Sequence, residues 1–278
     1  MVQLRPKVLF MSPETSVIIP AYNAGETIKS ALMSCLRQTN VDQTYEIIVV
    51  NDGSRDKTGE VLWMLRKKLP RNSFRIIEQD NQGSASAINL GVTQSCGEKI
   101  ILCDADDLLC PLAVNLLSQA LKGHAWATGE HIGFKRDSAE RTEVIYTTHK
   151  QAYLGDDKSE DNPLLHVHAL GHPKSFWKTD FEKVEGMDAN LRIAHDYDLA
   201  LKLLFSGEVK RWGLVPVVLY WYQSRPTSIS HVYREQQIKE GELTVTCALR
   251  RLRISKRGEC VGRDQTGYLL FNHVALGK

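Results

Sequence analysis

The sequence predicts an α/β fold in which a mostly parallel sheet is flanked by helices. Short continuous apolar runs alternate with stretches in which apolar residues recur at helical spacing, a pattern typical of parallel strands buried on both faces. Polar clusters at residues 20–23, 51–54 and 104–107 each follow one of these apolar runs. Because the ligand crevice of an open α/β sheet forms outside the carboxyl ends of its strands, the three clusters predict one shared site.

The first half of the chain alternates regularly between strands and helices. Strands are expected at residues 15–19, 45–50, 74–78 and 99–103. Helices are expected from residue 28 and at residues 58–69, 83–94 and 111–122. Asn23 followed by Glu26 predicts a capping box before the first helix, and Pro111 suits the first position of the fourth.

The second half is less regular and is expected to contain a small antiparallel region. Strands are expected at residues 125–134, 141–148 and 215–222, and a helix at residues 196–206. Residues 151–175, rich in His and Asp, are expected to form a loop, and the chain from residue 232 onward a helical tail. We therefore expect a main domain at residues 15–230, with extensions at residues 1–14 and, helical, at residues 231–278.

The bulk composition excludes some classes of function. A formal net charge of +2 excludes nucleic-acid binding that depends chiefly on bulk charge. The six cysteines include no C-x-x-C pair and the N-terminus does not resemble a signal peptide, so we expect a cytoplasmic protein with reduced thiols. No apolar run approaches the roughly 18 residues of a membrane span, so any membrane contact is expected to be peripheral.

The sequence Asp104-Ala105-Asp106 is the strongest candidate for a site. Two carboxylates after a buried strand would project into the crevice and repel each other unless a cation compensates them. A hard divalent ion such as Mn²⁺ or Mg²⁺ suits carboxylate and phosphate oxygens, and it would neutralise a departing diphosphate. The alternative is a solvated acidic turn that caps the next helix, and the position after a buried strand favours the metal.

Five motifs together resemble the family 2 glycosyltransferases. They are V-I-I-P-A-Y-N (17–23), V-N-D-G-S-x-D-x-T (50–58), D-N-Q-G-S-A-S-A-I-N-L-G (80–91), D-A-D-D (104–107) and G-M-D-A-N-L-x-x-x-H-D-Y-D-L-A-L-K-L (186–203). No single motif is specific, but all five stand in the family's order and spacing. The resemblance implies a Rossmann-like GT-A fold, with a nucleotide-sugar-binding half at residues 15–123 and an acceptor half at residues 124–230.

The resemblance also implies the residues that bind the donor. They are Pro20, Ala21, Tyr22, Asn23, Asp52, Gly83, Asn89, Asp104, Ala105, Asp106 and Arg225. Asp52 would accept a hydrogen bond from the base, commonly uracil, although an Asx-type turn that caps the next helix competes with this role. Asp104 would contact the ribose or the sugar. The metal, Mn²⁺ or Mg²⁺, would be bound by Asp106, Asp104 and His231.

Asp196 would be the general base that takes the proton from the acceptor hydroxyl. One base opposite the leaving group implies a single displacement with inversion. The alternative for Asp196 is an N-cap, because it precedes an apolar helix.

Three positions depart from the family pattern. His195 stands where Glu is common before the base, and Ile88 stands where an Arg often faces the nucleotide. Arg225 replaces a His that is a metal-ligand or phosphate-side candidate, and its guanidinium suits the diphosphate directly.

These observations predict a hexosyl- or N-acetylhexosaminyltransferase. It would use a UDP-sugar and a glycan or lipid-linked saccharide acceptor in polysaccharide biosynthesis. The basic stretch at residues 249–257 would touch the inner face of an anionic membrane, or else form a solvated helix face. A catalytically degenerate sugar-nucleotide-binding or assembly protein is the alternative. A nucleotidyltransferase or a dehydrogenase would need a Gly-rich loop where this chain has Pro-Ala-Tyr-Asn.

Overall fold

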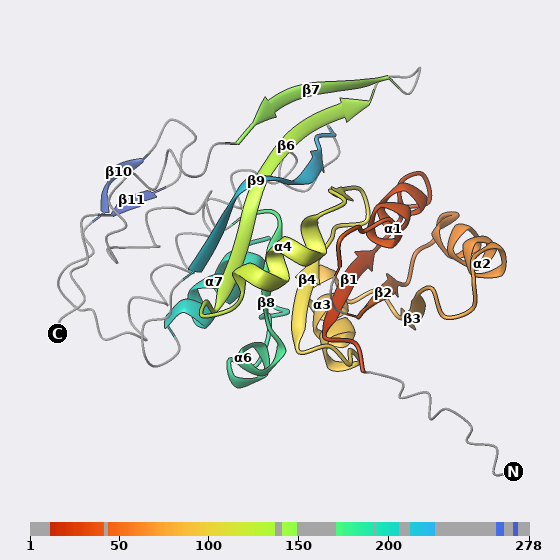
Figure 1. The fold of residues 1–278 in the computed structure, drawn as a ribbon, viewed down its shortest axis with the longest axis horizontal. Helices are drawn as coiled ribbons and strands as arrows, with labels where there is room; N and C mark the ends of the chain where they lie inside the picture. The colour runs from red at the N-terminus through yellow and green to blue at the C-terminus, as the bar shows by residue number, and fades with distance from the viewer. Residues whose placement is uncertain are drawn as a thin grey trace, which may run out of the picture.

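A computed structural model describes most of the first 225 residues and two short segments beyond them. The described residues are 12–41, 44–136, 141–148, 171–191, 193–205, 212–225, 260–263 and 269–271. Among them, nine strands form one sheet, and a separate two-stranded sheet lies near the C-terminus (Figure 1). No described helix combines the length and the apolar content that crossing a membrane requires.

The first half forms the parallel part of the sheet. Its strands are β1 (Thr15–Ala21), β2 (Tyr45–Asp52), β3 (Arg75–Gln79) and β4 (Lys99–Leu102). They pair in parallel in the order β3-β2-β1-β4. Its helices are α1 (Ile28–Leu36), α2 (Thr58–Lys68), α3 (Ser84–Thr93) and α4 (Ala113–Ala120). Strands and helices therefore alternate as the apolar pattern predicts.

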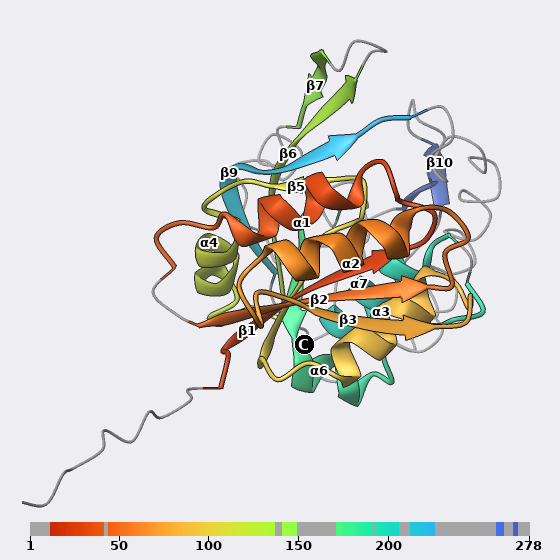
Figure 2. The same ribbon diagram turned by 90° about the vertical axis from the view of Figure 1, so that its right-hand side faces the viewer.

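The parallel strands are buried on both faces. Val17 and Ile19 of β1 pack with α1, α2 and α4, whereas Ile18 packs in a second cluster with α3. Figure 2 shows α1 and α2 lying over the strands on one side, with α3 on the other. Because successive residues of a strand point to opposite faces, a continuous apolar run supplies both clusters at once.

The second half extends the same sheet beyond β4. Its strands are β6 (Trp126–Arg136), β7 (Thr142–Thr147), β8 (Lys174–Trp177) and β9 (Trp212–Gln223), and its helices are α6 (Lys178–Lys183) and α7 (His195–Phe205). The short strand β5 (Leu108–Leu109), from the end of the first half, pairs with β9. Strand β8 is antiparallel to both β4 and β6 and thus joins the two halves. Strand β6 is parallel to β9, and the hairpin partner β7 is antiparallel to β6. The hairpin projects from the body of the protein (Figure 1).

Several local expectations are wrong. The loop expected over residues 151–175 ends in strand β8, and helix α6 follows it at once. The capping box is absent: α1 begins at Ile28 after Thr27, and the Asn23 side chain instead accepts a hydrogen bond from the Arg55 N–H. Helix α4 begins two residues after Pro111.

The described residues of the C-terminal tail, 260–263 and 269–271, contain no helix. Strands β10 (Cys260–Arg263) and β11 (Leu269–Phe271) pair there as an antiparallel ribbon. The rest of the expected helical tail and residues 1–11 lie outside the described residues.

Candidate active site

The loops after β1 and β2 are tied together by side-chain hydrogen bonds. The Asn23 N–H donates to Ser54 Oγ at 3.0 Å, and the Arg55 N–H donates to Asn23 Oδ1 at 2.9 Å. Asn23 has a positive φ of 48°, a conformation that Asn tolerates better than most residues. The predicted donor residue Tyr22, next to it, is 49% exposed. The first two polar clusters are therefore adjacent, as the sheet topology predicts.

Asp52 is buried and its carboxylate is already saturated with donors. Its Oδ1 accepts hydrogen bonds from Gln79 Nε2 at 2.6 Å and the Gln82 N–H at 2.8 Å. Its Oδ2 accepts from the Gly83 N–H at 2.9 Å and Asn81 Nδ2 at 3.3 Å. A carboxylate offers about four acceptor positions, so a nucleobase would have to displace one of these donors. Asp52 thus binds the backbone just before α3. The alternative drawn from the sequence was a turn that caps the next helix, which is α2 and not α3.

The turn at residues 104–107 is fastened to β9. The Asp104 N–H donates to the Tyr220 hydroxyl at 3.0 Å, and Asp107 Oδ1 accepts from the Gln223 N–H at 2.7 Å. Asp107 is 1% exposed, and its Oδ2 has no hydrogen-bond partner among the described residues. Burial and the neighbouring Asp106 and Asp104 charges raise the pKa of Asp107 well above its usual range.

Asp106 points to a cation rather than into open solvent. Its Oδ2 lies 2.7 Å from Arg225 Nη2, and the two side chains are 32% and 30% exposed. The predicted donor residues Asp106 and Arg225 therefore come together, although 119 positions separate them in the sequence.

Asp196 is held by a lysine that the sequence did not single out. Its Oδ2 lies 2.9 Å from Lys174 Nζ, and the Lys174 side chain is only 9% exposed. Burial alone would raise the pKa of Asp196, but the Lys174 ammonium, with His195 and His172, holds it well below its usual range. Helix α7 begins at His195, so Asp196 lies in the first turn and not at the cap. The predicted base is therefore ionised at neutral pH.

His172 is a second residue that the sequence did not single out. Its ring stacks on Tyr220 with centroids 4.7 Å apart, and its Nε2 lies 3.5 Å from Asp104 Oδ2. The only signal for it was the abundance of His and Asp at residues 151–175, without a recognisable spacing. His172 precedes β8, so pairing of β8 with β4 brings it to the aspartates.

The described residues fit a divalent cation at Asp104. Asp104, Asp107 and His172 each offer one ligand atom, and these atoms lie within 4.8 Å of one another. Two carboxylates and an imidazole form a donor set that suits Mn²⁺, and the partnerless oxygen of Asp107 is consistent with such a ligand. Asp106 does not belong to this group and is instead paired with Arg225. The other predicted ligand, His231, lies outside the described residues.

The other five predicted donor residues have positions that the structure explains without a ligand. The Asn89 amide exchanges two 2.9 Å hydrogen bonds with the Met187 backbone and so ties α3 to the segment before α7. Ala21 and Ala105 are buried in the core and offer only their backbone to a ligand. Gly83 has a φ of 90° and donates to Asp52, and Pro20 is half-buried at the end of β1. Their roles in donor binding stay predictions.

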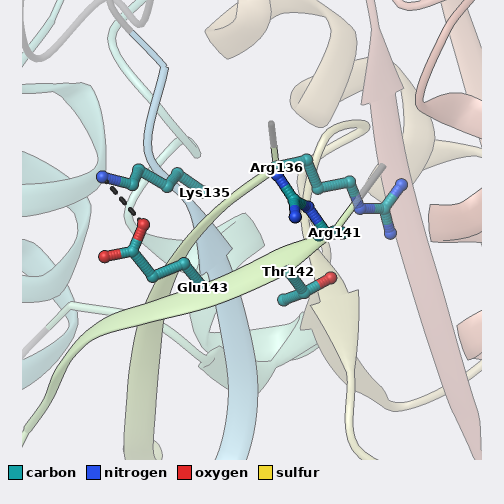
Figure 3. Close-up of a pocket in the computed structure, with 5 residues that line it drawn as sticks. All are labelled: Lys135, Arg136, Arg141, Thr142 and Glu143. Atoms are coloured by element: carbon teal, nitrogen blue, oxygen red, sulfur yellow. Dashed lines mark ion pairs between the residues drawn. The ribbon is translucent and has the colours of Figure 1, made fainter. Parts of the chain in front are cut away.

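A separate hollow lies on the projecting hairpin. It has a volume of about 330 Å³ and is lined by Lys135, Arg136, Arg141, Thr142 and Glu143 (Figure 3). Lys135 and Glu143 form an ion pair of 3.0 Å across β6 and β7. None of the predicted site residues lines it, and the candidate site is the group of side chains around Asp104, Asp106 and Asp196.

The open α/β sheet with an acidic turn after β4 is typical of α/β proteins that bind a ligand at the carboxyl ends of their strands. Comparison with known proteins gives the family. The model of the family described as "Glycosyl transferase family 2" matches residues 16–173. The chain is 30% identical to the chondroitin synthase of Pasteurella multocida (strain Pm70) over 276 residues, which cover 95% of this chain and 26% of that protein. It is 28% identical to the glycosyltransferase EpsJ of Bacillus subtilis (strain 168), over 80% of this chain and 64% of EpsJ. The chain thus belongs to family 2 of the glycosyltransferases.

Two of the solved structures that share its fold illustrate the comparison. One is S. aureus TarS 1-349 in complex with UDP-GlcNAc, with a TM-score of 0.64 at 19% identity over 85% of this chain and 66% of that one. The other is the mannosyltransferase PcManGT from Pyrobaculum calidifontis in complex with GDP-Man and Mn²⁺, with a TM-score of 0.63 at 19% identity over 87% of this chain and 65% of that one. The expected GT-A fold is confirmed. The chain spans less than two thirds of the length of EpsJ and about a quarter of the chondroitin synthase.

Proposed function

We propose that the chain is an inverting glycosyltransferase that moves a sugar from a UDP-sugar to an acceptor hydroxyl of a glycan or lipid-linked saccharide. The observation on which this rests is the ion pair of Asp196 with Lys174, whose ammonium also interacts with Asp104 and Asp107 of the acidic turn. The UDP-GlcNAc complex of TarS and the name of the chondroitin synthase support a UDP-sugar and a saccharide acceptor. The transferred sugar is then a hexose or an N-acetylhexosamine.

Asp196 would act on the acceptor side. It accepts the proton of the acceptor hydroxyl while the oxygen forms a bond to the anomeric carbon and the bond from that carbon to the diphosphate breaks. A carboxylate with a low pKa is a weak base, but the hydroxyl becomes much more acidic as its bond to carbon forms. Because the proposal assigns one base, Asp196, to this step and no covalent intermediate, attack comes from the face opposite the diphosphate and inverts the configuration.

The turn at residues 104–107 would act on the donor side. A Mn²⁺ or Mg²⁺ ion held by Asp104, Asp107 and His172 would supply positive charge to the leaving diphosphate. Tyr22, 49% exposed beside Asn23, would stack on the base. We further propose a cytoplasmic enzyme, peripheral at the inner face of the membrane, where lipid-linked acceptors lie. The basic residues at 249–257 that would contact the lipid lie outside the described residues.

The test is the variant Asp196→Asn, assayed for release of UDP from UDP-sugars. We expect turnover to fall roughly 10²- to 10⁴-fold, the usual contribution of general base catalysis, while calorimetry shows UDP binding retained. Glu182→Gln, on the exposed side of α6, is the matched control and should keep full turnover. Unchanged turnover in Asp196→Asn would exclude the assigned base. A wild-type protein that binds UDP but transfers no sugar would instead support the degenerate, assembly role.

A further inference from the structure

A group of aromatic and imidazole rings lies beside the acidic turn. The rings belong to His131 on β6, Tyr146 on β7, His172 before β8, and Tyr220 and Tyr222 on β9. Neighbouring rings are close, with centroid separations that run from 4.7 Å between His172 and Tyr220 to 6.5 Å between His131 and His172. We call these five side chains the aromatic face.

Strand pairing brings the rings of β6, β7 and β9 to one side of the sheet. Gly133 of β6 is paired with Tyr146 of β7 on one side and with Tyr222 of β9 on the other. His131, two residues earlier on β6, is paired with Tyr220. Paired residues on neighbouring strands, and residues two apart on one strand, point to the same side of a sheet. The aromatic face therefore extends from β9 onto the projecting hairpin of β6 and β7 (Figure 1).

The aromatic face begins at the carboxylates of the candidate site. The Tyr220 hydroxyl accepts a hydrogen bond of 3.0 Å from the Asp104 N–H. At the hairpin, burial and the charges of Tyr222 and Asp107 raise the pKa of Tyr146 to about 12. The Tyr146 hydroxyl is therefore close enough to the acidic turn to be affected by its charge. The rings thus lead from the acidic turn outward to Tyr146.

Tyr146 is the most exposed of the five side chains, at 41%, and its ring is held on one side only. A Cβ built on Gly133 would overlap the ring atoms Cδ1, Cε1 and Cζ of Tyr146. These are three consecutive ring atoms, so the face of the ring lies over Gly133. The His131 ring stands at 81° to it, with the centroids 5.8 Å apart. The opposite face of the Tyr146 ring is therefore turned away from the sheet, and the ring loses little freedom when a ligand covers it.

A pyranose ring suits such a surface. One face of a pyranose carries several C–H groups with a small positive charge, and the face of an aromatic ring is negative, so the two attract each other while apolar area is buried. The hydroxyl groups of Tyr and the ring nitrogens of His can also hydrogen-bond with sugar hydroxyls. A surface of this composition therefore fits a saccharide better than a purely apolar ligand.

We propose that the aromatic face binds the acceptor saccharide, with Tyr146 as its outer stacking platform. The inference deepens the proposed function and rests on it, because it takes the acceptor to be a saccharide. The reacting sugar of the acceptor would lie at the acidic turn, and a sugar further along its chain would stack on Tyr146. The hollow at residues 135–143 lies further along the hairpin and is not part of this surface.

Saccharide binding in the presence of UDP and Mn²⁺ tests the proposal. The probe is a glycan array of oligosaccharides that end in hexoses, N-acetylhexosamines or uronic acids, and the saccharide that binds best is then titrated in solution. Tyr146→Ala is expected to bind it roughly 10-fold more weakly, the worth of one stacked ring, and Tyr146→Phe within about threefold of the wild type. In transfer assays the KM for that saccharide should rise by a similar factor, with kcat and the Kd of UDP unchanged.

Two further variants separate stacking from a structural role of the ring. Gly133→Ala displaces the Tyr146 ring without removing it, so saccharide binding should weaken by a similar factor. The double variant Gly133→Ala/Tyr146→Ala should bind no more weakly than Tyr146→Ala, because both changes act through one ring. Trp63→Ala removes an exposed ring from α2 and is the matched control, which should keep full saccharide binding. Thermal melts verify that each variant folds.

Failure of the inference and failure of the proposed function are distinguishable. Wild-type protein that binds UDP but no saccharide of the array, or Tyr146→Ala that keeps full saccharide affinity, would overturn the inference alone. Weaker UDP binding in Tyr146→Ala would assign the ring to the nucleotide and overturn it as well. If saccharide binding depends on Tyr146 but the wild type neither binds UDP nor transfers a sugar, the proposed transferase activity fails and the aromatic face remains a saccharide-binding surface.

Discussion

Asp52 in the parallel part and Asp106 and Asp196 at the other part of the site are held by different means. In the parallel part, Asp52 is bound only by neutral donors, two side-chain amides and two backbone N–H groups. Around β8 and β9, by contrast, carboxylates meet cations: Lys174 binds Asp196, and Arg225 binds Asp106. In the parallel part Asp52 therefore fixes the loop before α3, and the strands beyond β4 supply the positive charge at the site. A substitution at Asp52 should therefore alter stability, and a substitution at the cations around β8 and β9 should alter activity.

Removing the cation of β8 should have the largest effect. In Lys174→Met, Asp196 loses its partner, and kcat/KM at neutral pH is expected to fall roughly 30-fold, the low end for truncating a buried ion pair. Because Lys174 lowers the pKa of Asp196 and the base acts when ionised, the acidic limb of the pH profile should move to higher pH. Lys174→Arg should keep the wild-type limb. An acidic limb that stays in place in Lys174→Met would mean that Lys174 does not set the charge of the base.

Removing Asp52 should instead cost stability. Asp52→Ala leaves the N–H groups of Gln82 and Gly83, just before α3, without their side-chain acceptor, and the free energy of unfolding in urea is expected to fall by about 1 kcal/mol, the usual cost of a lost helix cap. UDP affinity, measured on the folded fraction, should change less than in Arg225→Ala. Full stability with lost UDP binding would show the opposite, that Asp52 serves the nucleobase and not α3.

The buried Asp107 gives stability a pH dependence of its own. Its pKa in the folded state is raised, whereas in the unfolded chain it is about 3.9, so the folded state binds more protons between the two values. Stability should therefore decrease as pH rises through that window, as followed by urea midpoints at pH 5 and pH 8. In Asp107→Asn the decrease should be smaller, while Oδ1 still accepts the Gln223 N–H. An equal decrease in the variant would assign the effect to other groups.

Substitutions at the hollow on the β6–β7 hairpin should have the smallest effect on stability and on activity. Lys135 and Glu143 form an exposed ion pair, so Lys135→Ala is expected to change the free energy of unfolding by less than about 0.5 kcal/mol. UDP binding and turnover should be those of the wild type. A clear loss of turnover would extend the acceptor site to the hollow.

The sequence was informative where structure is decided locally. The parallel strands and the polar residues at their ends were predictable. A continuous apolar run such as residues 45–50 indicates a buried strand by itself, and the turn residues follow it directly in the sequence. Strand β8 was not, because four residues containing Lys174 and Ser175 form a strand only by pairing with β4 and β6 on both sides. His172 and Lys174 reach the site through that pairing. The partners of Asp106 and Asp196 were likewise hidden, since no local pattern reports an ion pair between distant segments.

The position of β8 also has a consequence for synthesis of the chain. A ribosome makes β1 to β4 first, and until residues 174–177 emerge, β4 is an edge whose N–H and C=O groups face solvent. That edge carries the apolar sequence Lys-Ile-Ile-Leu, a template for pairing with another nascent chain. A chain truncated before residue 174 should therefore aggregate by edge-to-edge association, detectable by light scattering, even though all four parallel strands are present.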